Sequence, residues 1–175
     1  MDYKSLRNLE HDPELATALG NMVVAWAHAE TSLLFTLARV TGASVHMAQA
    51  GYYRIPTFES RTKFILALMQ EWHPPAAEFN RGTIIKAVEK LSKLASARNG
   101  WVHGDWCVAA DKSETVIFDH RADSQSAHRR RPVKAADVRN HNEAVLKRSQ
   151  ELDGLIVSDE LLASPDKPQR PFDGQ

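Results

Sequence analysis

Apolar residues recur every three or four positions over most of the chain, and this spacing predicts amphipathic helices. The longest begins after Asp12, which can cap a helix, and ends at Gly42. Because it is long for a small domain, we expect it to form the backbone of a bundle. The same periodicity predicts further helices at residues 44–53, 56–72, 83–103 and 133–156. The fold class is therefore all-α, a helical bundle of about four to five helices.

The period changes after Gly104, because apolar and polar residues then alternate. Alternation predicts a small β-hairpin at about 105–119, appended after the fourth predicted helix. A basic loop is expected at 121–132, and the proline-containing tail, 164–175, is expected to be disordered. With a flexible N-terminus at 1–11, residues 12–163 form one predicted domain.

The composition is that of an ordinary globular protein, with 43% hydrophobic and 25% charged residues among 175. Its 22 basic and 22 acidic residues cancel, so any nucleic-acid site must be local. The single cysteine, Cys107, excludes an internal disulfide and fits a reducing compartment. No apolar run is long enough to cross a bilayer. We therefore expect a cytoplasmic protein with no membrane partner.

Three polar residues lie close together near the end of the fourth predicted helix. Arg98 falls where the stripe calls for an apolar side chain, Asn99 follows it, and His103 is the fifth residue after it. A buried guanidinium is costly unless it is paired or meets an anion. An imidazole can exchange protons near neutral pH, and a guanidinium can hold a phosphate by two hydrogen bonds. These are the minimum groups for metal-free phosphodiester cleavage, although such a pair also serves as a capping and packing device.

The pattern Arg98-Asn99-x-x-x-His103, late in an all-helical chain, resembles the signature of the HEPN superfamily, without identifying a subfamily. The upstream layout is also similar, since a long first helix carries residues 24–30 and a later helix carries Arg61. The resemblance covers residues 12–105. It implies a homodimer in which the two motifs share one cleft. It also implies a metal-independent endoribonuclease associated with toxin–antitoxin or phage-defence loci, with an antitoxin protein as a further partner.

In the chemistry that this resemblance implies, His103 is the general base on the ribose 2′-hydroxyl. Arg98 holds the scissile phosphate, and Asn99 orients the imidazole or the phosphate. The expected products are a 2′,3′-cyclic phosphate and a 5′-hydroxyl. Many members of the superfamily are thought to bind rather than cleave, so the alternative is a non-catalytic dimer that binds a nucleotide or a protein. A purely structural interaction domain is a third interpretation.

Two further groups of charged residues have a structural and a functional interpretation. Glu30 lies in the apolar stripe of the first helix and is expected to form a structural ion pair with Arg61; the alternative is a role in the site. Arg129, Arg130 and Arg131 end the basic loop, where they either contact RNA or form a solvated loop. No histidine and cysteine spacing is typical of a metal site, so we expect no metal and no cofactor.

Overall fold

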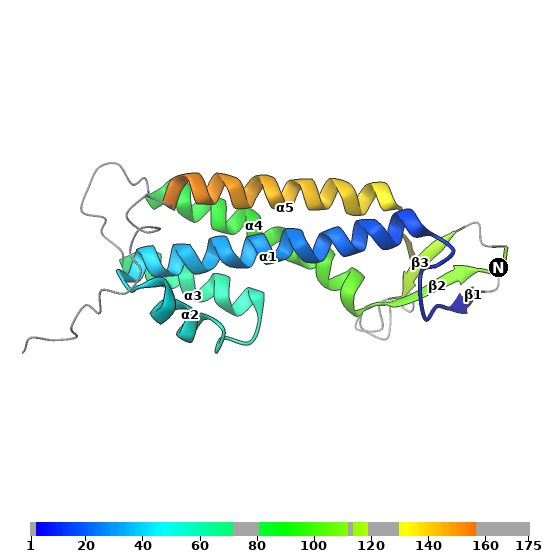
Figure 1. Ribbon diagram of the computed structural model, residues 1–175, viewed down its shortest axis with the longest axis horizontal. Helices are drawn as coiled ribbons and strands as arrows, with labels where there is room; N and C mark the ends of the chain where they lie inside the picture. Colours follow the sequence, from blue (N-terminus) through cyan, green and yellow to red (C-terminus); the bar gives the residue numbers. More distant parts are fainter. Residues whose placement is uncertain (1–2, 72–80, 112–113, 119–129, 157–175) are drawn as a thin grey trace, which may run out of the picture.

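Three long helices lie side by side along the molecule, as Figure 1 shows for the computed structural model. They are α1 (Pro13–Thr41), α4 (Arg81–His103) and α5 (Ala135–Ile156). The shorter helices α2 (Val45–Tyr52) and α3 (Phe58–Glu71) pack on α1 at one end. The structure describes residues 3–71, 81–111, 114–118 and 130–156. The prediction of a helical bundle with appended strands is confirmed, whereas the tail at 164–175 and most of the basic loop lie outside the described residues.

The helix ends follow from local capping. Asp12 accepts a hydrogen bond from the Leu15 amide at 3.0 Å, and Pro13 occupies the first helical position of α1. Gly42 ends this helix in the left-handed region, at φ 66°, where a side chain would be strained. Ser44 caps α2 by accepting from the Met47 amide at 3.3 Å. These short-range signals explain why the predicted bounds of α1 and α2 agree closely with the structure.

The core fills the space between α1, α4 and α5, with α3 closing one side. Leu33 of α1, Leu91 of α4 and Val145 of α5 are fully buried. Helices α1 and α5 make the most extensive contact of the bundle. Asn142 of α5 reinforces it, because its side-chain amide donates to the Ala18 carbonyl of α1 at 2.8 Å. Among the described helices, none is both long enough and apolar enough to cross a membrane.

A small antiparallel sheet covers the end of the bundle at which α1 and α5 begin and α4 ends (Figure 1). Its described strands, in spatial order, are β1 (Tyr3–Ser5), β2 (Asp105–Ala109), β3 (Thr115–Phe118) and β4 (Arg130–Pro132). The predicted hairpin corresponds to β2 and β3.

The outer strands of this sheet are a difference from the sequence prediction. Residues 3–5 were assigned to a flexible terminus and residues 130–132 to a basic loop, but they pair with β2 and β3 respectively. Three residues are too few to display an alternating pattern. Both segments become strands because the hairpin offers them unpaired backbone groups on its two edges.

Candidate functional site

The last turns of α4 carry the motif, and they remain regularly helical through His103. Arg98 points along the inward stripe, as its position in the sequence predicts. Its guanidinium carbon lies 5.8 Å from the centre of the Trp26 ring of α1, a cation–π geometry. The guanidinium also donates to the Asn99 side-chain oxygen at 3.1 Å. Arg98 is therefore half-buried and held by an aromatic ring and a neighbouring amide.

His103 lies on a different side of the same helix. The residue is exposed and makes no hydrogen bond or ion pair to the residues that the structure describes. Five residues on a regular helix correspond to a rotation of roughly 140° from Arg98. Gly100 does not interrupt this turn, because α4 continues helically through that residue. Within one chain, therefore, Arg98 and His103 face different directions.

A row of three side chains from the sheet lies against the end of α4. The register pairs Trp106 with Ile117 and Ile117 with Arg131, so all three project from one face of the sheet. The Trp106 indole donates to the carbonyl of Trp101 at 2.9 Å. Ile117 lies over Gly104, and the Arg131 guanidinium lies over Gly100. The predicted RNA-binding residue Arg131 is thus in contact with the motif helix.

Gly100 and Gly104 allow this close approach. A Cβ added at Gly104 would lie 2.1 Å from Ile117 Cγ2, and one at Gly100 would lie 3.3 Å from Arg131 Nη2. Gly104 directly follows the last residue of α4. Its φ is not positive, and the structural requirement for glycine comes from the Ile117 side chain and from the Gly100 carbonyl, which would lie 2.8 Å from an added Cβ. The two glycines, four residues apart, form one flat strip on which the sheet packs.

Sequence reasoning missed a residue beneath the motif, His141 of α5. Its imidazole lies between Trp101, at 4.9 Å and nearly perpendicular, and Trp26, at 6.0 Å. Burial lowers the pKa of His141, so the ring is neutral at neutral pH. Its position between Val138 and Val145, at helical spacing, was the available signal for an inward-facing residue. Both tryptophans that support the motif therefore pack on this imidazole.

The predicted pair of Glu30 and Arg61 is present, and it belongs to a larger cluster. Arg61 donates to Glu30 at 2.9 Å and to the Ile55 carbonyl at 2.9 Å, while the Tyr52 hydroxyl donates to the other carboxylate oxygen. The Arg61 guanidinium also lies 4.9 Å from the centre of the Tyr52 ring. Burial and the bond to Glu30 raise the pKa of Tyr52. The cluster joins α1, α2 and α3, and no motif residue is among these contacts.

The remaining predicted site residues are only partly described. Arg129 lies outside the described residues, and Arg130 belongs to β4, in register with Phe118. Within the described ranges, no group of three or more histidine, cysteine or acidic residues could hold a metal ion.

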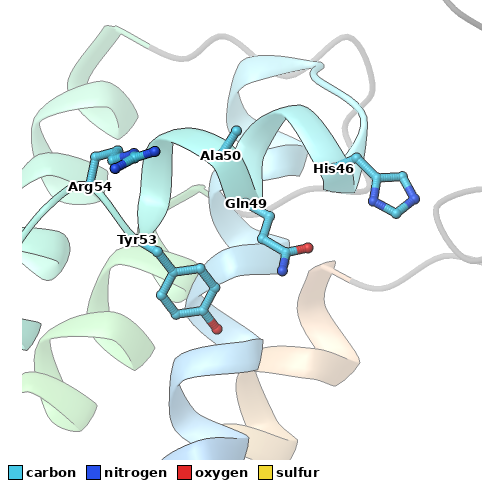
Figure 2. A pocket seen from close by; sticks show the side chains of 5 residues that line it. All are labelled: His46, Gln49, Ala50, Tyr53 and Arg54. Carbon is cyan, nitrogen blue, oxygen red and sulfur yellow. The ribbon is translucent and has the colours of Figure 1, made fainter.

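A shallow hollow lies elsewhere on the surface, along α2 and the two residues that follow it. Figure 2 shows the side chains that line it: His46, Gln49, Ala50, Tyr53 and Arg54. The hollow is open, and no residue of the motif lines it. We place the candidate site at the end of α4 instead, because this segment carries the motif and because side chains of α1, β3 and β4 pack against it.

Comparison with known proteins found no relative of this chain. No protein-family model matches the chain, and no curated protein and no solved structure matches it.

Proposed function

We propose that this protein is a metal-independent endoribonuclease of HEPN type, and that its reactive side chains lie at the end of α4. One observation carries the proposal. An exposed imidazole, His103, occupies the last turn of a helix on which two arginines also lie, Arg98 on its own helix and Arg131 from the sheet. A proton-transfer group on a helix end that also carries two cations suits a phosphodiester substrate.

The proposed chemistry assigns one step to each group. His103 removes the proton from the ribose 2′-hydroxyl, and the resulting oxygen attacks the adjacent phosphorus. The bond to the 5′-oxygen of the next nucleotide breaks, which leaves a 2′,3′-cyclic phosphate and a 5′-hydroxyl. Arg98 stabilises the charge that develops on the phosphate, and Asn99, which already accepts from Arg98, fixes its orientation.

A second copy of the chain would complete the site, because one copy does not bring Arg98 and His103 to the same cleft. The rotation of roughly 140° between Arg98 and His103 prevents them from facing one cleft in a single chain. A two-fold axis near the end of α4 would place Arg98 of one protomer opposite His103 of its partner. Exposed valines support such a contact, since Val23 and Val24 of α1 and Val102 of α4 are about half exposed or more.

The alternative is a non-catalytic dimer that binds a nucleotide or a protein through the same surface. The observation that favours it is the existing engagement of Arg98, whose guanidinium lies on Trp26 and donates to Asn99. An arginine with these two contacts has a role in the packing of α4 on α1. The two functions can be distinguished by their products, because only the endoribonuclease cleaves RNA.

An RNase assay on varied single-stranded RNAs, with and without EDTA, tests the proposal. His103→Ala should reduce cleavage by roughly 10²–10⁴-fold, the usual contribution of one acid–base group. EDTA should change nothing. Arg98→Lys should retain little activity, because an ammonium cannot reproduce the planar fork of a guanidinium.

His46→Ala is the matched control, since it removes an exposed imidazole from α2, away from the proposed contact surface, and should leave cleavage intact. Cleavage that persists in His103→Ala, or that disappears with EDTA, would contradict the mechanism. Binding of a nucleotide or a protein without any cleavage would establish the alternative.

A further inference from the structure

The Arg131 guanidinium lies on the side of α4 that leads to His103. The strands of the sheet contact α4 one after another around the helix. β2 contacts Trp101, β3 contacts Gly104 and β4 contacts Gly100. On a regular helix, the next position of this last turn in the same direction is His103. The edge strand β4 is therefore the part of the described sheet that borders the imidazole.

The spacing allows both groups to reach one ligand. Arg131 Nη2 lies 3.3 Å from the point where a Cβ of residue 100 would be. Residues three apart on a helix have Cβ atoms about 5–6 Å apart, so the side chain of His103 begins close to this guanidinium. Both side chains are exposed, and neither is paired with a residue that the structure describes.

The Arg131 guanidinium supplies the positive charge that an anion requires at this point, because it is always protonated. It also offsets the carbonyl dipoles at the C-terminus of α4, which by themselves disfavour an anion. Asp105 is the acidic residue that follows, but it adjoins Trp106 in β2. Because strand residues alternate between faces, Asp105 lies on the opposite face from the Trp106–Ile117–Arg131 row.

We propose that Arg131 and His103 form a phosphate-binding site across the junction of β4 and α4, with Gly100 as its floor. The ligand is a phosphate group, and, resting on the proposed function, it belongs to the RNA strand that is cleaved. Arg131 is then the phosphate-holding cation on the His103 side of the helix, and Arg98 serves the other side. Gly100 has a specific role here, because any side chain would displace the guanidinium.

Binding of a single-stranded RNA with 2′-O-methyl riboses tests this site without cleavage, because the attacking hydroxyl is blocked. Arg131→Ala should weaken binding by roughly ten- to a hundredfold, the range for a hydrogen bond to a charged group. The slope of affinity against salt should fall by about 0.7, the value for one phosphate of a single strand. Gly100→Ala should weaken binding less, because the guanidinium shifts by only a few tenths of an ångström.

Two control variants separate the site from general effects. Arg54→Ala removes the same charge from the segment after α2, and Gly154→Ala adds a methyl group to α5 where nothing lies within 4 Å. Both should bind like the wild type. In NMR spectra, inorganic phosphate alone should shift the His103 ring signals and the Arg131 side-chain signals together, and Arg131→Ala should abolish the His103 shift.

The outcomes distinguish this inference from the proposed function. If Arg131→Ala binds RNA as Arg54→Ala does, while the wild type cleaves RNA and His103→Ala does not, the phosphate site is wrong and the nuclease stands. If phosphate and the blocked RNA bind through Arg131 but natural RNA is never cleaved, the nuclease is wrong and the site stands. If the wild type binds neither probe, the site is overturned.

Discussion

The Glu30 carboxylate is held by hydrogen bonds from two neighbouring side chains. Its carboxylate accepts from Arg61 and from Tyr52, and its side chain retains only 23% of its exposure. Removal of one member of such a pair leaves the other uncompensated in a partly buried place. The position of the cluster, between three helices, indicates a structural role.

We expect Glu30→Ala to lower the free energy of unfolding by about 3 kcal/mol, near the lower end of the cost for a broken buried pair. Denaturant unfolding measures this loss. Glu14→Ala removes the same group from the same helix, where Glu14 forms an exposed pair with Arg139 of α5, and should cost less than about 1 kcal/mol. If Glu30→Ala retained stability but lost RNA cleavage, the structural interpretation would be wrong and Glu30 would belong to the site.

His141 predicts how stability depends on pH. Its pKa is lowered by burial, so the unfolded chain binds this proton more readily than the folded one. Its contribution to stability is therefore complete above the ordinary histidine pKa of about 6.5 and is lost as pH falls through the lower folded value.

Unfolding measured across this acidic range should show the loss in the wild type and a weaker pH dependence in His141→Phe. His28→Ala, which changes an exposed imidazole, should keep the loss. An unchanged slope in His141→Phe would assign the acid sensitivity to another group.

At the scale of elements, the packing of the sheet on α4 depends on a glycine that the sequence shows only as a helix breaker. The Ile117 side chain occupies the space that a Cβ of residue 104 would need. Because β3 is paired on both sides, it cannot retreat without moving β2 and β4. The position of the whole sheet is thus coupled to the end of the motif helix.

Gly104→Ala should therefore destabilise the protein by roughly 1–3 kcal/mol, the usual cost of overpacking. It should also reduce RNA cleavage, because the sheet carries Arg131. Gly20→Ala, where nothing lies within 4 Å, should instead stabilise α1 by about 0.5–1 kcal/mol. Thermal unfolding compares the two variants, and equal effects would show that Ile117 adapts without cost.

At the scale of the whole molecule, the decisive issue is whether two chains complete one site. α1 and α4 run antiparallel, so Val23, one turn before Trp26, and Val102, one turn after Arg98, lie toward the same end of the bundle. Between Leu15 and Ala29, α1 carries no charged residue. An uncharged helix face beside the motif is a suitable surface for a second copy.

We expect light scattering to show a dimer, and mixed variants to test the shared cleft directly. Arg98→Ala and His103→Ala should each be inactive alone. A refolded mixture should regain activity, because one of the two clefts in a mixed dimer contains both an intact Arg98 and an intact His103. A monomer in solution, or a mixture that remains inactive, would contradict the shared site.

The sequence by itself determined the helices, their caps and the identity of the candidate groups. Helical periodicity and capping are properties of neighbouring residues, so Asp12, Gly42 and the stripe interrupted by Arg98 could be read directly. The pairing of Glu30 with Arg61 was also accessible, because a charge in an apolar stripe requires a partner. These inferences required no knowledge of which helices meet.

Only the tertiary structure decided how the groups are arranged around the end of α4. Strand pairing between residues far apart in the chain brings Arg131 onto Gly100, and no local pattern encodes that contact. Packing of α5 likewise places His141 between two tryptophans. The different directions of Arg98 and His103 follow from a helix that stays regular through Gly100.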